Sequence, residues 1–315
     1  MKQALRSAGM IGAMVLSWSV YYAVSKIMVD ATGSAFAAGL LLRSAALLFL
    51  TAQLLADGNF KRLFHQGKAV VILLAIGLFG FLLDTFANLG YAGGSLSTGT
   101  ALLKTDVLMV NLATVVIYRK KLYLSDWIGT AVMLFGVLLV LDVDFGGMRF
   151  NVRDLFFILS AACVTANAFI IKTAQEKYHE DADMISYYNN FVVLVLFALS
   201  VCIGGRPVLP AAPGRGFWYL VLLGGLAQTG IYFFYYRNLK CYEVWVVKLY
   251  LLLMPVVSCF IGVLFLGEAL GAKKLVGVAV VLLGAALILL RSRLHRDEAQ
   301  LAAHGDQTPP AANDE

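Results

Sequence analysis

Ten stretches of mostly apolar residues, each 17 to 23 residues long, follow one another along this sequence with short polar segments between them. A helix needs about 20 apolar residues to cross the hydrocarbon core of a bilayer, so each stretch is long enough to span a membrane. The predicted spans cover residues 8–28, 35–55, 69–91, 96–117, 126–142, 154–172, 184–203, 217–237, 244–266 and 272–291. The pattern predicts an all-α membrane protein with ten transmembrane helices.

The composition supports this class and argues against a soluble one. Hydrophobic residues make up 60% of the chain and charged residues 14%, and the mean hydropathy is +0.80. A soluble fold does not have enough interior to enclose that many apolar side chains. We therefore expect the lipid bilayer to be the partner of most of the surface.

The positions of Lys and Arg predict how the chain is oriented. Outside the spans, 15 of these residues lie on the side of the membrane that holds the N-terminus and 6 lie on the other side. Because Lys and Arg are enriched in cytoplasmic loops, we expect a multi-pass protein of the cell membrane with both termini in the cytoplasm. The net charge of +6 is spread over short loops and not gathered on one face, so it predicts no nucleic-acid partner.

The two halves of the chain resemble each other at an offset of 148 residues. This offset aligns Gly129 with Gly277 and Gly136 with Gly284, and in each half the two glycines are seven residues apart. That spacing places both on one helix face, where small residues favour close helix packing in membranes. Each half holds five spans, an odd number, so the second half enters the membrane in the opposite sense to the first.

We therefore predict two inverted five-helix repeats, residues 1–146 and residues 150–291. The remaining residues, 292–315, are polar, contain a Pro pair and end in acidic residues. A segment of this kind does not bury enough apolar surface to fold alone, so we predict a disordered cytoplasmic tail.

Several residues match the pattern of one known family. In the second half, Pro255 precedes Glu268 by thirteen residues, and the two glycines of the last span follow. In the first span Trp18 and Lys26 are eight residues apart, and Arg43 lies in the second span. Together with the ten spans and the two repeats, this combination resembles the EamA-type transporters of the drug/metabolite transporter superfamily, across both halves of the chain.

The resemblance implies a ten-helix bundle whose third, fourth, eighth and ninth helices line a central cavity. It also implies that the fifth and tenth helices pack at the contact between the repeats. The function that it implies is transport of a small molecule, and export more than import.

Five ionisable residues, Arg43, Asp84, Lys104, Asp106 and Lys248, lie well inside the predicted spans. A charge near the bilayer centre costs roughly 2.5 to 3.5 kcal/mol on insertion scales, so such residues line polar cavities or pair with one another. Lys104 and Lys248 lie in corresponding helices of the two halves and suit an anionic group of a substrate, whereas Asp106 suits an amine or a proton. The alternative is that Asp84 and Asp106 neutralise the cations in static buried pairs.

Uncharged polar residues in the spans are further candidates for substrate contact. Gln228 and Tyr232 are four residues apart and so share one helix face, which we expect to look into the cavity. Asn111 lies in the fourth span. Aromatic residues also gather at membrane interfaces without binding a ligand, and this alternative applies to Tyr232 as well.

The sequence lacks the motifs of several enzyme classes. It contains no GxxxxGK[ST] phosphate loop, no HExxH or GxSxG motif and no cluster of His and Cys. We therefore expect no cofactor, no bound metal and no enzymatic activity.

These features predict a secondary transporter that moves a small polar metabolite, such as an amino acid or a related organic solute, by alternating access. Asp84 or Asp106 would couple transport to protons if burial keeps it protonated near neutral pH, and uncoupled transport is equally compatible. Two other classes remain open: a membrane-embedded enzyme or lipid-handling protein that acts on a lipid headgroup, and a structural or sensory bundle that transports nothing.

Overall fold

The computed structural model describes residues 2–64, 67–91, 102–117, 119, 122–140, 152–205, 207–254, 256–257, 271–273, 275–284 and 287. The secondary structure of this part of the chain is helical throughout, as predicted. The helices are α1 (Lys2–Thr32), α2 (Ala35–Ala56), α3 (Val70–Tyr91), α5 (Thr105–Val116), α6 (Leu124–Val140), α7 (Val152–Lys177), α8 (Ala182–Gly204), α9 (Arg215–Cys241), α10 (Val244–Leu251) and Leu275–Gly284. Two 3-10 turns, η1 (Phe60–Phe64) and η2 (Gly67–Ala69), lie between α2 and α3.

Six helices in the described part of the chain are long and apolar enough to cross a membrane. They are Ala8–Thr32, Ala35–Ala56, Val70–Gly90, Leu155–Lys177, Ala182–Gly204 and Arg215–Cys241. These segments match the first, second, third, sixth, seventh and eighth predicted spans. The other four spans correspond to the shorter helices α5, α6, α10 and Leu275–Gly284. The multi-pass membrane class is confirmed, and the full number of ten spans stays a prediction. The predicted tail, residues 292–315, lies outside the described residues.

Local sequence signals explain where some of these helices begin and end. Gly33 follows α1 with a φ of +64°, in the left-handed region that favours glycine and often terminates a helix. Ser34 then caps α2, because its hydroxyl oxygen accepts a hydrogen bond of 3.3 Å from the Ala37 backbone N–H. Gly205, with a φ of +57°, ends α8 in the same way. Gly33 and Ser34 thus account for the short connection between α1 and α2.

The surface and the interior of the bundle are distributed as lipid requires. Large apolar side chains are exposed on several helices: Leu48 is 69% exposed, Val71 75% and Ile203 86%. A soluble monomer rarely leaves extended apolar surface uncovered, whereas hydrocarbon solvates it. Charged side chains such as Arg43 and Lys248 are instead buried inside. These charged side chains therefore lie in the interior of the bundle, and apolar side chains cover much of its outer surface.

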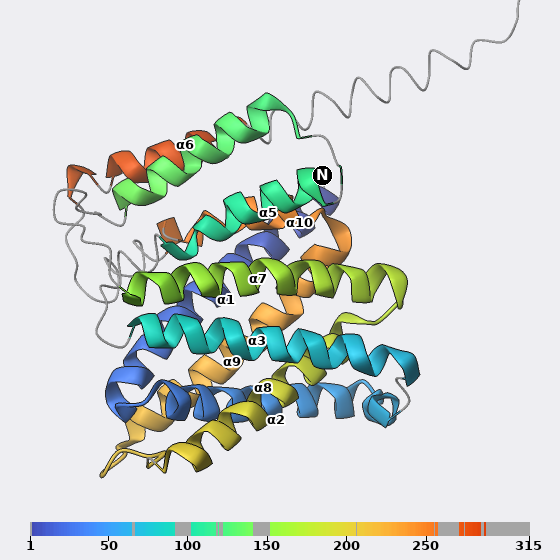
Figure 1. Cartoon of the computed structure of the whole chain (residues 1–315), viewed down its shortest axis with the longest axis vertical. Coiled ribbons are helices and arrows are strands. Elements are labelled where there is room, and N and C mark those ends of the chain that lie inside the picture. The colour runs from blue at the N-terminus through green and yellow to red at the C-terminus, as the bar shows by residue number, and fades with distance from the viewer. Residues whose placement is uncertain are drawn as a thin grey trace, which may run out of the picture.

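The helices pack in layers that follow the repeat. Figure 1 shows α3 alongside α7 near the middle of the bundle, with α2 and α8 at one end of its long axis and α6 at the other. The closest pairings are α3 with α7 and α1 with α9, followed by α2 with α8, α2 with α9 and α3 with α8. At the 148-residue offset α1, α2 and α3 correspond to α7, α8 and α9. The offset therefore exchanges the α3–α7 pairing with the α1–α9 pairing and the α2–α9 pairing with the α3–α8 pairing. It maps the α2–α8 pairing onto itself. Two repeats related by a twofold axis produce this exchange.

The close contact between α6 and Leu275–Gly284 shows the same reciprocity at the level of single residues. A Cβ added to Gly136 would lie 2.7 Å from the Val281 backbone nitrogen, and a Cβ added to Gly284 would lie 3.1 Å from the Met133 backbone nitrogen. Gly136 and Gly284 are repeat equivalents, and so are Met133 and Val281. The order of the contacts also shows that the two helices run antiparallel, because Gly136 meets the earlier residue of the partner helix and Met133 the later one.

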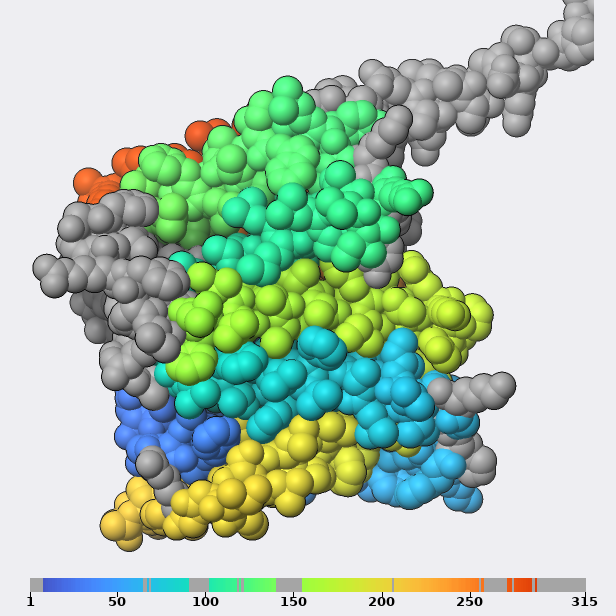
Figure 2. All heavy atoms as spheres, viewed as in Figure 1, coloured from blue at the N-terminus to red at the C-terminus, as the bar shows by residue number. Residues whose placement is uncertain are grey.

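The other two aligned glycines take part in this contact. The same added Cβ atoms would lie 3.0 Å from the Gly277 carbonyl oxygen and 3.2 Å from the Gly129 carbonyl oxygen. The prediction of close helix packing is therefore confirmed for Gly136 and Gly284, and Gly129 and Gly277 lie at the same contact through their carbonyl oxygens. Figure 2 shows α6 at the end of the bundle, beyond α5 and α7, so this contact closes one end of the molecule.

The α2 and α8 pair, which joins equivalent helices of the two halves, is antiparallel as well. Gly39, early in α2, lies against Phe197, late in α8. The Asp183 carboxylate, at the start of α8, accepts a hydrogen bond of 3.1 Å from the Gln53 side chain, near the end of α2. The two halves therefore meet with their equivalent helices reversed.

The reciprocal glycine contacts make a stability prediction. Gly136→Ala and Gly284→Ala each force the backbones of α6 and Leu275–Gly284 apart, and overpacking of this kind costs about 1 to 3 kcal/mol. Both variants should lower the thermal unfolding midpoint of the purified protein in detergent, and by similar amounts because the two positions are equivalent. Gly12→Ala is the matched control, since nothing lies within 4 Å of a Cβ there. A Gly284→Ala variant as stable as the Gly12→Ala variant would contradict this packing.

Candidate functional site

A buried ion pair between α2 and α3 forms the centre of the site. The Arg43 guanidinium donates from Nη2 and from Nε, the latter at 3.2 Å, to Oδ2 of Asp84. The side chains are 4% and 11% exposed. Breaking such a pair leaves an uncompensated charge in a low-dielectric interior, so each residue holds the other in place. This pair is one of the buried pairs considered from the sequence.

The second half of the chain contributes to the same group of residues. Arg43 Nη1 donates to the hydroxyl oxygen of Tyr232 on α9, and the guanidinium carbon lies 5.6 Å from the centroid of the Tyr232 ring. The Arg43 carbonyl oxygen accepts a hydrogen bond of 3.0 Å from the Asn190 amide on α8. The arginine thus links one helix of the first half to two helices of the second.

A cavity of about 40 Å³, lined by polar and apolar side chains together, lies beside this pair. One water molecule needs about 10 to 15 Å³ on this measure, so the cavity has room for two or three. Its lining comes from α1, α2, α3, α7, α8 and α9, that is, from three helices of each half. The charged and amide side chains that line it are Arg43, Asp84, Asn167, Asn189 and Gln228, and the aromatic ones are Trp18, Tyr21, Tyr232, Tyr235 and Tyr236.

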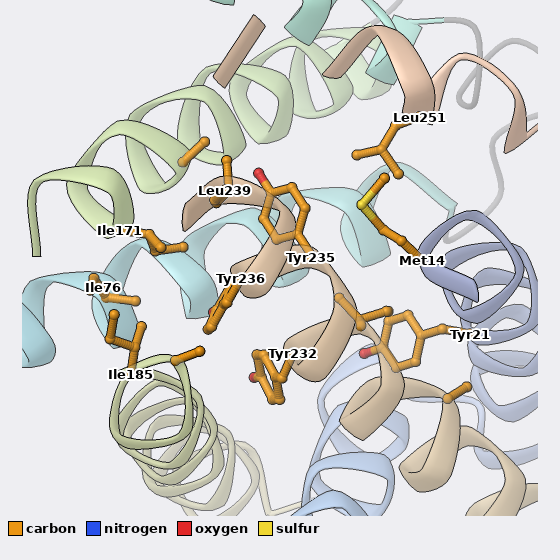
Figure 3. Close-up of a cluster of buried hydrophobic side chains, with 14 of the residues drawn as sticks. Met14, Tyr21, Ile76, Ile171, Ile185, Tyr232, Tyr235, Tyr236, Leu239 and Leu251 are labelled. Carbon is orange, nitrogen blue, oxygen red and sulfur yellow. The ribbon is translucent and has the colours of Figure 1, made fainter. Parts of the chain in front are cut away.

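Figure 3 shows how the aromatic part of the lining is arranged. Tyr232 and Tyr236 lie on one side of α9 and Tyr21 approaches from α1, while the ring of Tyr235 points away from the other two α9 tyrosines. The Tyr232 and Tyr236 rings are 5.4 Å apart between centroids. The four-residue spacing places Gln228 on the Tyr232 face, and both residues line the cavity, as their spacing predicted.

Four residues of the cavity lining each have a buried polar atom without a protein hydrogen-bond partner among the described residues. These atoms are Nε1 of Trp18, Oδ1 of Asn167, Oδ1 of Asn189 and the hydroxyl oxygen of Tyr235. Buried polar groups in proteins are nearly always hydrogen-bonded, so an unpaired group calls for a partner from outside the protein. One N–H donor, two carbonyl acceptors and one hydroxyl group therefore remain unpaired beside the cavity.

Lys104, Asp106 and Lys248 form a second buried cluster, where α5 meets α10. Lys248 Nζ donates to Oδ2 of Asp106 at 2.9 Å, and the two side chains are 1% and 10% exposed. Lys104, which directly precedes α5, is 7% exposed. None of the three is among the residues that line the cavity described above. The nearest connection is Tyr235, which lines the cavity and whose ring centroid lies 5.6 Å from Lys248 Nζ.

Asn111 belongs to neither group. Its side-chain amide donates a hydrogen bond of 3.3 Å to Thr130 on α6, and it is fully buried between α5 and α6. The structure thus brings together four of the eight predicted site residues around the cavity, Arg43, Asp84, Gln228 and Tyr232. It gathers three others in the second cluster and places Asn111 in a helix contact.

The cavity differs from the expectation in which helices form it. The resemblance implied lining by the third, fourth, eighth and ninth spans. The structure confirms the third and eighth, as α3 and α9, and adds the first, second, sixth and seventh. In the described parts of the fourth and ninth spans no residue lines the cavity. Pro255 and Glu268, which carried part of the resemblance, lie outside the described residues.

Sequence reasoning missed some lining residues. Tyr21 and Asn167 were not predicted, although Asn167 is an amide near the middle of an apolar span. Asn189 was not predicted to line the cavity either. Its side-chain amide donates to the Tyr236 hydroxyl on α9, and the residue also belongs to the cavity lining.

One end of the bundle carries a group of ion pairs, of which the Arg62–Asp181 pair joins the two halves. Arg62 Nη2 lies 2.9 Å from Oδ2 of Asp181, and Lys240 Nζ lies 3.9 Å from Oδ1 of the same carboxylate. Arg237 Nη2 lies 3.3 Å from Oδ1 of Asp183. In the adjacent loop, partial burial and the nearby Asp181 charge raise the pKa of Glu180. We call this group the Asp181 end.

A multi-pass helical bundle that encloses a cavity between two similar halves is typical of membrane transport proteins. Comparison with known proteins makes this specific: the model of the EamA-like transporter family matches residues 7–142 and again residues 152–290. The chain therefore belongs to the EamA-like transporter family, and the family indicates a transporter and not an enzyme.

Two individual proteins are similar to this chain. A protein of Sinorhizobium sp, described as an uncharacterized transporter in the cobO 3'region, is 32% identical over 132 residues, which make up 42% of this chain and 92% of that protein. A solved structure, described only as a crystal structure of a protein, superposes with a TM-score of 0.73 at 19% identity and covers 92% of this chain and 98% of its own. The second likeness supports the fold alone.

The buried pair makes a prediction about stability. Asp84→Asn leaves Arg43 charged and unpaired in the interior, which costs about 3 to 5 kcal/mol. The double variant Arg43→Met/Asp84→Leu removes both charges and should regain most of that loss. Thermal unfolding of the purified variants in detergent measures both effects.

The exposed pair at the Asp181 end is the control. The Arg62 and Asp181 side chains are 55% and 43% exposed, so Asp181→Asn should cost no more than about 1 kcal/mol. An Asp84→Asn variant no less stable than Asp181→Asn would contradict the buried pair.

Proposed function

We propose that this EamA-family protein is a secondary transporter that moves a small polar metabolite, such as an amino acid or a related organic solute, by alternating access. We assign export as its direction. Residues 1–146 and 150–291 act as two inverted five-helix repeats with ten spans in all, and both termini lie in the cytoplasm. The antiparallel α2–α8 and α6–Leu275–Gly284 contacts support the inverted arrangement.

The observation that carries the proposal is the unpaired polar lining of the cavity between the halves. Trp18, Asn167, Asn189 and Tyr235 come from α1, α7, α8 and α9, and each has one buried polar atom without a protein partner beside the same small space. Such groups suit a carrier, which binds its solute at the contact that moves during transport.

The charged lining supports a solute that carries both charges. Arg43 presents a planar fork of donors, which suits a carboxylate, and Asp84 accepts hydrogen bonds, which suits an ammonium group. In the absence of solute the two residues neutralise each other. A zwitterion offers each of them a new partner of the right sign, so binding replaces the pair without leaving a bare charge.

The size of the cavity supports a closed state of the cycle. Space for two or three water molecules is too small for an amino acid, so solute enters only after the halves separate. At the Asp181 end, separation breaks the Arg62–Asp181 pair, which is exposed and therefore weak, together with the Gln53–Asp183 hydrogen bond. These contacts are suited to a gate that closes and reopens.

We assign direct solute contact, once the halves have separated, to Arg43, Asp84, Gln228 and Tyr232. The predicted contacts of Lys104, Asp106, Lys248 and Asn111 require the cavity to widen toward α5 and α10. The two sets are therefore distinguishable by mutation.

Counterflow in proteoliposomes tests the function. The wild-type protein should accelerate uptake of at least one radiolabelled solute from a panel of amino acids and small organic acids when the lumen holds the same solute unlabelled. Tyr232→Phe removes the hydroxyl that Arg43 binds, and the loss of a hydrogen bond to a charged group should raise KM about tenfold. Tyr219→Phe is the matched control, because Tyr219 is 69% exposed on the same helix.

No accelerated uptake of any panel member by the folded wild-type protein would remove the proposal. Release of a modified lipid headgroup under the same conditions would favour the lipid-handling class instead. Lys104→Ala and Lys248→Ala variants that are folded and show unchanged counterflow would remove both amines from solute contact.

A further inference from the structure

The second buried cluster contains more positive than negative groups. It consists of two amines, on Lys104 and Lys248, and one carboxylate, on Asp106, and Lys248 alone occupies that carboxylate within the ion-pair distance of 4.0 Å. Lys104 Nζ instead lies 3.5 Å from the Leu251 carbonyl oxygen and 3.4 Å from the Met254 sulfur. Among the described residues, no carboxylate pairs directly with the Lys104 amine.

The protonation state of Lys104 therefore decides the net charge of the cluster. With both amines protonated the cluster carries one excess positive charge, and with Lys104 neutral it carries none. A buried charge with weak partners is costly, whereas a neutral amine is buried at much lower cost and still donates to a carbonyl oxygen. The titratable groups that act on Lys104 within the described chain are Asp106, two residues along, and Lys248 on α10. The nearest contact from α7 is uncharged, the Thr165 hydroxyl at the Asp106 carbonyl oxygen.

The place of Lys104 in the fold connects its charge to the movement of the two halves. Helix α10 ends at Leu251, and α5 begins just after Lys104. The 148-residue offset pairs Lys104 with Leu252, so the fourth and ninth spans are interrupted at equivalent positions. The Lys104 amine faces the carbonyl end of α10, where the helix dipole is negative and favours a cation. In transporters of inverted repeats, such interrupted helices commonly hold the coupling ion.

The cluster also lies next to the proposed solute site. Tyr235 lines the cavity, and its ring lies 5.6 Å from Lys248 Nζ. Figure 3 shows the Tyr235 hydroxyl directed away from Tyr232 and Tyr236, with Leu251 of α10 on the same side of the picture. Tyr235 therefore connects the wall of the cavity directly to the second cluster.

We propose that Lys104 is the proton-binding site of the transporter, and that its Nζ takes up one proton and releases one proton in each transport cycle. The inference rests on the proposed carrier function and adds its coupling ion. The step is a simple protonation, in which the neutral amine gains a proton from water on one side of the membrane and returns it to water on the other. Asp106 and Lys248 stay paired and hold the amine at the contact between α5 and α10.

The test measures proton and solute fluxes together. Proteoliposomes hold pyranine in the lumen and the panel solute that gives the fastest counterflow, and downhill efflux of that solute is followed with the luminal pH. The wild-type protein should move about one proton for each solute molecule. The ratio of proton flux to solute flux should fall at least tenfold in Lys104→Met, whose side chain never binds a proton.

Two further variants separate a proton site from a fixed cation. Lys104→Arg keeps a permanent positive charge, so it should lose the proton flux as Lys104→Met does. If Lys104 acted only as a fixed positive charge, Lys104→Arg would keep the wild-type proton flux. Lys26→Met makes the same chemical change at an exposed lysine of α1 and should keep the wild-type ratio. If Lys104→Met fails to give a monodisperse protein in detergent, Lys104→Arg carries the test.

The outcomes distinguish this inference from the function beneath it. Solute efflux without proton flux in the wild type, or a wild-type ratio in Lys104→Arg, would overturn the proton site and leave the carrier intact. Absence of counterflow for every panel solute in the wild type would overturn the carrier itself.

Discussion

The pairing of buried charges is the constraint on which the rest of this structure depends. In a bilayer, hydrocarbon solvates the exposed leucines and valines of the outer surface but not a guanidinium or a carboxylate. Arg43 and Asp84 therefore find each other between α2 and α3, and the remaining donor of Arg43 reaches Tyr232 on α9. This single group of residues links α2, α3 and α9, and the cavity lies beside it.

Packing of small residues supplies what the charges do not. Lipid offers helices no hydrophobic reason to associate, so close contact depends on residues without bulky side chains. The contact of α6 with Leu275–Gly284 is built from glycines that repeat at the same offset in each half. Gly136 contacts Val281 and Gly284 contacts Met133, and these two partners are themselves equivalent in the repeats. Because the two surfaces of this contact are equivalent, a movement of one half relative to the other changes both surfaces in the same way. The reciprocal arrangement of α1, α3, α7 and α9 extends the same property through the bundle.

Much of this was predictable from the sequence, and the limits have a physical cause. Apolar length identified the membrane class and the six long helices, and the paired glycines identified the contact that they make. The ionisable residues were identified as buried, but one sequence does not state how each helix is rotated about its axis. For that reason Lys104 and Lys248 were expected in one cavity with Arg43 and Asp84, whereas the structure separates them into two clusters joined through Tyr235. Asn167 was missed for the same reason, since a lone amide in a span faces the cavity, a neighbouring helix or neither.

The central claim is that the two halves enclose a cavity that opens in turn to the two sides of the membrane. Ala168 on α7 lines this cavity and is 1% exposed, and Ala168→Cys adds one sulfur atom there. In a chain whose four native cysteines are replaced by serine, the rate of labelling by a membrane-impermeant thiol reagent is measured from each side in turn. The account predicts labelling from both sides, slowed from both by a transported solute. Labelling from one side only, or labelling that no transported solute slows, would contradict it.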